Sequence, residues 1–141
     1  TKSVFQIPTA YVIDRIRGER DDFWLLFSFT VLIALTPLLY LIIETPLQLY
    51  GVQFLLGLFA AFTFPSYMAI FTRHIDKNKE GTEWGVYFTL TDLSSATFAA
   101  IGGYIASTEG FPVLIMAVSV LTFIGALLLL FVKPYIRRGV R

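Results

Sequence analysis

The chain has 141 residues, of which 56% are hydrophobic and only 15% are charged, and its net charge is +1. Soluble domains hold about 45–50% apolar and about 25% charged residues, so this composition excludes a soluble domain and indicates an integral membrane protein. The sequence contains no cysteine and a single histidine, which excludes disulfides, thiolate chemistry and a zinc cluster. We expect no metal and no cofactor.

The first segment, residues 3–16, is a short apolar run that leads into a dense charge cluster. At about 1.5 Å per residue, the apolar part of this run spans only about half of a bilayer. We therefore expect a truncated N-terminal helix, the last part of a spanning helix that begins earlier in a longer protein. Two alternatives are an amphipathic segment lying on the membrane surface and a flexible terminus.

Four longer apolar segments follow, separated by short loops. Residues 23–43 hold no charged side chain, and at about 1.5 Å per residue a helix of this length crosses the roughly 30 Å hydrocarbon core. The other predicted membrane helices are 51–72, 84–107 and 113–132. Because the loops are short, consecutive helices run antiparallel. The sequence thus predicts an all-α membrane protein in which residues 1–141 form one partial transmembrane domain.

The basic residues of the loops and of the C-terminal segment occur on only one side of this arrangement. They precede the first full helix, fill the loop after the second and follow the fourth, at Arg15, Arg17, Arg20, Arg73, Lys77, Lys79, Lys133, Arg137, Arg138 and Arg141. The positive-inside rule then predicts that the N-terminal loop, the 73–83 loop and the C-terminus are cytoplasmic, with the protein in the plasma (inner) membrane. Topology alone accounts for these charges, so we expect no nucleic-acid partner.

The charge cluster carries a family resemblance in the stretch AYVIDRIRGER, residues 10–20. It resembles the cytoplasmic loop signature of the major facilitator superfamily, Gly-x-x-x-Asp-Arg-x-Gly-Arg-Arg, although the glycine at position 18 comes one residue late. A second stretch, GTEWGVYFTLTDLSSATFAAIGGYIASTEGF at residues 81–111, is similar to the penultimate helix of that superfamily in its Gly-x-Tyr step and late Gly-Gly pair.

This resemblance implies that the four full helices are the ninth to twelfth of twelve and that residues 3–16 end the eighth. It implies a secondary transporter that moves a small-molecule solute by alternating access, with the lipid bilayer and the remaining helices of the full-length protein as partners. In the family, the Asp-Arg loop ties helix ends together in one of two conformations. The residues onto which this gating role carries are Asp14, Arg15, Arg17 and Arg20. A solvated loop that only fixes topology is the alternative.

Asp92 is the only charge inside the predicted helix 84–107. It lies about eight residues, or roughly 12 Å, from the cytoplasmic end of that helix. A carboxylate there costs about 2.5–3.5 kcal/mol unless it is protonated, paired or hydrated. We therefore expect Asp92 to carry a proton or to bind a cationic substrate or sodium. A structural partnership with neighbouring Ser or Thr hydroxyls is the alternative.

Three further residues are candidates for binding the substrate or a coupling ion. Ser95 lies one helical turn from Asp92, and Gln53 and Tyr67 belong to the helix 51–72. The family resemblance places this helix and the helix 84–107 along the substrate cavity. Close packing against other helices is the alternative for Ser95, which belongs to a stripe of small residues.

An enzyme is not predicted, because the sequence holds no Gly-rich phosphate loop, no paired carboxylates and no histidine base beside a serine. Two other functions compete with a transporter fragment. One is a complete four-helix membrane protein that serves as an assembly or interaction subunit, and the other is a small four-helix transporter that works as a dimer.

Overall fold

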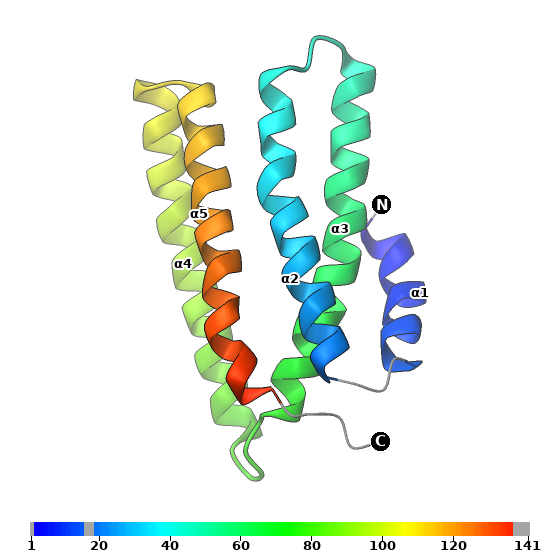
Figure 1. Cartoon of the computed structure of the whole chain (residues 1–141). Coiled ribbons are helices and arrows are strands. Elements are labelled where there is room, and N and C mark those ends of the chain that lie inside the picture. The colour runs from blue at the N-terminus through cyan, green and yellow to red at the C-terminus, as the bar shows by residue number, and fades with distance from the viewer. Residues whose placement is uncertain (1, 16–18, 137–141) are drawn as a thin grey trace.

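The computed structural model describes residues 2–15 and 19–136, and the regular elements in these ranges are helices (Figure 1). The α-helices are α1 (Lys2–Arg15), α2 (Glu19–Leu35), α3 (Pro46–Arg73), α4 (Glu80–Thr108) and α5 (Phe111–Val132). The chain continues from α2 into a 3₁₀ helix, Thr36–Leu41, and from α5 into another, Lys133–Tyr135. Figure 1 shows α2 to α5 running side by side, with the short α1 beside the lower part of α3.

Three segments are long and apolar enough to cross a membrane: Arg20–Leu41, Pro46–Arg73 and Phe111–Tyr135. They confirm the predicted fold class, an all-α integral membrane protein. With 29 residues, α4 is also long enough to cross at about 1.5 Å per residue. Its hydroxyl side chains, glycines and acidic residues make it the least apolar of the long helices, and it is not among the three. The crossing of residues 84–107 stays a prediction.

The start of α3 lies at Pro46, well before the predicted start at Gly51. Thr45 caps the helix, because its Oγ1 accepts the backbone N–H of Gln48 at 3.4 Å while Gln48 Oε1 accepts the backbone N–H of Thr45 at 3.0 Å. This reciprocal pair is a capping box, and proline is favoured at the first helical position. The Thr-x-x-Gln spacing is the sequence signal for this earlier start.

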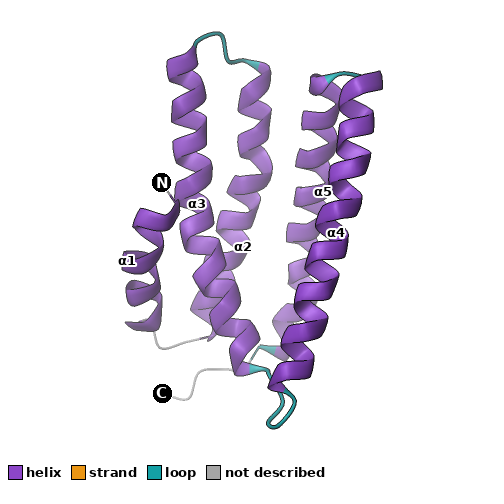
Figure 2. Ribbon diagram, turned by 180° about the vertical axis from the view of Figure 1, so that it is seen from behind, coloured by secondary structure: helices purple, strands orange, loops and turns teal. Residues whose placement is uncertain are grey.

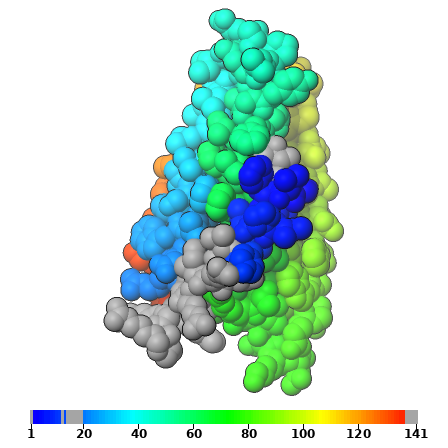
Figure 3. All heavy atoms as spheres, turned by 90° about the vertical axis from the view of Figure 1, so that its right-hand side faces the viewer, coloured from blue at the N-terminus to red at the C-terminus, as the bar shows by residue number. Residues whose placement is uncertain are grey.

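The packing of the helices is uneven. Contacts join α3 to both α1 and α2, and join α5 to both α2 and α4. Figure 3 shows α1 lying against α3 on one side of the bundle, and Figure 2 shows α4 and α5 as a pair. Between α2 and α3 the rings of Phe29 and Phe62 stack with their centroids 4.5 Å apart. In contrast, α4 has no buried residue, so it is the least enclosed helix of the bundle.

Pro65 interrupts the backbone hydrogen bonding of α3 without ending the helix. A proline has no N–H, so the carbonyl of Ala61, four residues earlier, lacks its helical donor. Thr9 of α1 supplies one, because its Oγ1 lies 2.8 Å from the Ala61 oxygen and both residues are buried. The same hydroxyl lies 2.9 Å from the carbonyl oxygen of Phe5, which has a helical N–H donor of its own. Thr9 thus ties α1 to α3 where Pro65 weakens it.

We expect Thr9→Val to lower the free energy of unfolding by about 1 kcal/mol, because a methyl group cannot donate to the Ala61 carbonyl. In a Pro65→Ala background this cost should shrink, since residue 65 then provides its own N–H. Unfolding titrations in a denaturing detergent measure the free energy of unfolding of the parent, the two single variants and the double variant. The matched control is Thr91→Val, whose hydroxyl bonds to the Tyr87 carbonyl of its own helix. If Thr9→Val lowers the free energy of unfolding equally in both backgrounds, the Thr9 hydroxyl does not compensate for Pro65.

Candidate functional site

Asp92 lies near the middle of α4. The helix α4 begins at Glu80, where two acidic residues in the first turn, Glu80 and Glu83, complement the helix dipole. Asp92 is therefore about 18 Å from the start of this 29-residue helix at the usual rise per residue. The side chains of residues 91–100, Asp92 included, are exposed.

Ser95 belongs to the same exposed face, three positions after Asp92, and residues at this spacing are neighbours on a helix. It lines a shallow pocket of about 470 Å³ with residues of the same helix. The nearby hydroxyls of Thr91 and Thr97 donate to carbonyls of their own helix, each at 2.8 Å. The hydroxyls of these two threonines thus donate to the backbone and not to the carboxylate of Asp92.

The structure does not bring Gln53 and Tyr67 together. They are about 21 Å apart along α3 at the usual helical rise. Gln53 Nε2 donates to the hydroxyl oxygen of Tyr40 at 2.9 Å, which joins α3 to the preceding 3₁₀ helix. Tyr67 stacks on Phe71 and faces Tyr87 of α4, with centroid distances of 6.0 and 5.9 Å. Tyr67 therefore lies between α3 and α4, whereas Gln53 lies toward the opposite end of the bundle.

An aromatic cluster holds α3 and α4 together at the end where residues 74–79 connect them. The ring centroid of Phe71 lies 5.0 Å from that of Trp84 and 5.1 Å from that of Tyr87. Pairs of this kind contribute about 0.5–1.5 kcal/mol each beyond the area they bury. Further along α4 the exposed face with Asp92 begins, so the aromatic cluster marks the point at which α4 and α3 part.

A cavity of about 400 Å³ lies between α2, α3 and α5, with Lys2 of α1 at its edge. Its polar lining residues are Lys2, Thr30, Thr63 and Tyr67. Lys2 Nζ lies 4.7 Å from the ring centre of Phe64, a favourable cation–π arrangement. Sequence reasoning gave Lys2 no role. The available signal was the distance of Lys2 from the charge cluster, which begins 12 residues, or about 18 Å, further along the helix.

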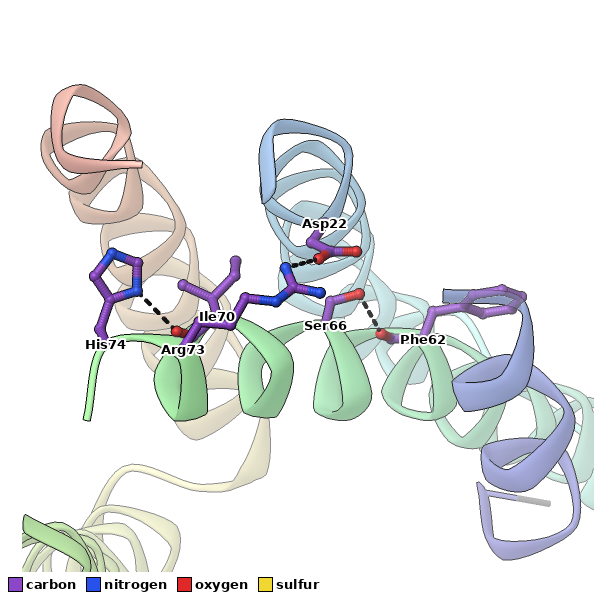
Figure 4. Close-up of polar contacts among 6 residues, drawn as sticks. All are labelled: Asp22, Phe62, Ser66, Ile70, Arg73 and His74. Atoms are coloured by element: carbon purple, nitrogen blue, oxygen red, sulfur yellow. Dashed lines mark hydrogen bonds and ion pairs between the residues drawn. The ribbon is translucent and has the colours of Figure 1, made fainter. Parts of the chain in front are cut away.

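The ion pair between Asp22 and Arg73 links α2 to α3 (Figure 4). Arg73 Nη1 donates to Asp22 Oδ2 at 2.5 Å, and the carboxylate is fully buried while the arginine side chain is 37% exposed. Figure 4 shows Arg73 reaching toward Asp22 while the Ser66 hydroxyl donates to the Phe62 carbonyl at 3.0 Å. A buried carboxylate needs such a partner because the loss of hydration is expensive.

Sequence reasoning missed this pair, because Asp22 served only as a helix boundary and Arg73 only as a topology marker. The signal that could have found it is an acid at the start of one membrane helix and a base at the end of the next. Antiparallel helices bring these two positions to the same side of the membrane.

The gating-loop candidates are only partly described. Asp14 and Arg15 end α1, but their side chains lie outside the described residues, as does Arg17 altogether. Arg20 is exposed at the start of α2 and lines a pocket with Lys133. Among the described residues, no group of three or more His, Asp or Glu side chains is placed to hold a metal ion.

Comparison with known proteins identifies the family of this chain. The family model described as Major Facilitator Superfamily matches residues 1–140. The chain belongs to the major facilitator superfamily. The resemblance read from residues 10–20 and 81–111 is thereby confirmed, and the function class is that of a secondary transporter. Searches among curated proteins and among solved structures return no match.

We expect a double-mutant cycle of Asp22→Asn and Arg73→Gln to give a coupling energy of about 1–3 kcal/mol, because the carboxylate is buried. The matched control is a cycle of Asp76→Asn and Lys79→Gln. That ion pair spans 3.2 Å between side chains that are each 66% exposed, and it should couple by less than about 1 kcal/mol. Unfolding in detergent measures both cycles. Equal coupling energies would show that burial does not strengthen the Asp22–Arg73 ion pair.

Proposed function

We propose that this chain is part of the C-terminal half of a major facilitator transporter, with α1 as the end of the eighth helix and α2 to α5 as the ninth to twelfth. The whole protein moves a small solute across the membrane by alternating access, driven by a proton or cation gradient. The family match supports the transporter class, and the order of helices and basic segments supports the position in the fold. The observation that carries the proposal is the exposed carboxylate of Asp92 near the middle of α4.

An exposed carboxylate at this position favours a water-filled pathway. Contact with lipid would cost about 2.5–3.5 kcal/mol on insertion scales, and intramembrane acids usually face a cavity or another helix. The exposed face of α4 also carries hydroxyl groups, of which Ser95 is the nearest in position to Asp92. In this proposal Asp92 takes up the coupling ion or the cationic group of the solute, and Ser95 contributes a hydroxyl to the same ligand.

The proposal assigns the basic segments to the cytoplasm. On that side the aromatic cluster joins α3 to α4, and the Asp22–Arg73 pair joins α2 to α3. Asp14 and Arg15, the last two residues of α1, lie on the same side in this proposal. Charge pairs at helix ends stabilise one of two discrete arrangements, so their breakage accompanies the switch between inward-open and outward-open states.

We expect Asp92→Asn, made in the transporter that contains this chain, to abolish gradient-driven accumulation while leaving the amount of protein in the membrane unchanged. An amide cannot take up a proton or attract a cation, whereas Asp92→Glu should keep part of the activity. Uptake of a panel of labelled solutes into proteoliposomes, over a pH series, measures the effect. Thr91→Val is the control on the neighbouring position. Unchanged uptake by the Asn variant across the series excludes the coupling role.

We expect Asp14→Asn to shift the balance between the inward-open and outward-open states, because it removes a charge from the gating loop. A cysteine placed at Ser95, in a transporter otherwise free of cysteine, reports the balance through its rate of labelling from each side of the membrane. Asp76→Asn, in the other basic loop, is the matched control. Identical labelling in the Asp14 variant and its parent counts against gating.

A further inference from the structure

The ends of α2 and α5 on the basic side of the bundle enclose a pocket of about 270 Å³. Its lining residues are Arg20, Phe23, Trp24, Lys133, Pro134 and Ile136. Phe23 and Ile136 are buried and give the pocket an apolar part, whereas the two cations and the tryptophan are exposed around it. The pocket therefore combines two positive charges with an apolar surface.

Among the described residues, the lining of this pocket contains no acidic side chain that would neutralise its charge. Asp21, next to Arg20 in the sequence, is exposed and is not a lining residue. Asp22 is turned to Arg73 of α3. Lys133 is held in place by an aromatic ring instead, since its Nζ lies 4.8 Å from the ring centre of Trp24.

The depth of the pocket matches that of lipid head groups. Arg20 is the first residue of the span Arg20–Leu41, and Lys133 lies near the end of the span Phe111–Tyr135. Both cations thus stand at the boundary between hydrocarbon and water, where tryptophan is also enriched.

Topology does not require this convergence. The positive-inside rule asks for Lys and Arg near helix ends, but it does not bring a residue before one span and a residue after another into the same pocket. Basic pockets between membrane helices suit phosphorylated head groups, and a guanidinium can bind phosphate through two parallel hydrogen bonds. We propose that the Arg20–Lys133 pocket binds the phosphate of an anionic phospholipid.

A free phosphate ion offers the same charge to the cations, but the apolar residues of the pocket and its place at the bilayer edge favour the lipid. A lipid bound here contacts both α2 and α5. It therefore holds together the ends of the first full helix and the last one, a contact that is independent of the transported solute.

The test compares two lipids on the purified transporter that contains this chain. Binding of phosphatidylglycerol and of phosphatidylcholine is measured in detergent by native mass spectrometry. The parent should prefer phosphatidylglycerol by about tenfold at low salt, because each surface cation adds to the attraction. The double variant Arg20→Gln/Lys133→Gln should lose most of this preference. The matched double variant Lys77→Gln/Lys79→Gln removes the same charge from the loop between α3 and α4 and should keep it.

Three outcomes overturn the proposal: equal binding of both lipids by the parent, an equal loss in the two double variants, or displacement of phosphatidylglycerol by inorganic phosphate as readily as by the unlabelled lipid. The last outcome identifies a site for free phosphate. If Arg20→Gln/Lys133→Gln does not fold, Lys133→Gln alone is measured. It changes one exposed residue and should reduce the preference by roughly threefold, so an unchanged preference in that variant is equally decisive.

Discussion

Every backbone polar group that enters the bilayer core needs a partner inside the protein, because hydrocarbon offers none. In α3 one carbonyl meets that constraint through a donor from another helix. Pro65 leaves the Ala61 carbonyl without a helical donor, and the hydroxyl of Thr9 approaches it to 2.8 Å. The short α1 therefore has a structural role, since the hydroxyl of Thr9 completes the hydrogen bonding of α3.

The same constraint makes α3 the centre of one group of helices. It is tied to α1 through Thr9 and to α2 through the Asp22–Arg73 pair, and both contacts bury a polar group. The connection between α3 and α4 is apolar, because an aromatic cluster joins the two helices at one end. The helix α4 also packs against α5. Polar contacts thus join α1, α2 and α3, while α4, which carries Asp92, contacts α3 through aromatic rings.

The sequence predicts the helices well because hydropathy and loop charge are local properties. The early start of α3 was also local, encoded in the Thr45 to Gln48 capping box, which hydropathy does not register. The start of α4 lies four residues before the predicted start, which lengthens the helix by about 6 Å. The Asp22–Arg73 pair joins residues 51 positions apart, so no local pattern contains it. The separation of Gln53 from Tyr67 follows from their spacing alone, but the pairing of Tyr67 with Tyr87 does not.

The basic residues show how one pattern serves several purposes. As a set they orient the helices, and for that role their exact neighbours are unimportant. Individually they differ, because Arg73 compensates a buried carboxylate, Lys79 forms an exposed local pair, and Arg20 and Lys133 share a pocket. An exposed pair adds little stability, a buried pair is costly to break, and an uncompensated pair of cations attracts an anion. Basic residues that look equivalent in the sequence therefore have different roles. In our proposal Arg73 joins two helices, Lys79 serves only the topology, and Arg20 and Lys133 contact a lipid.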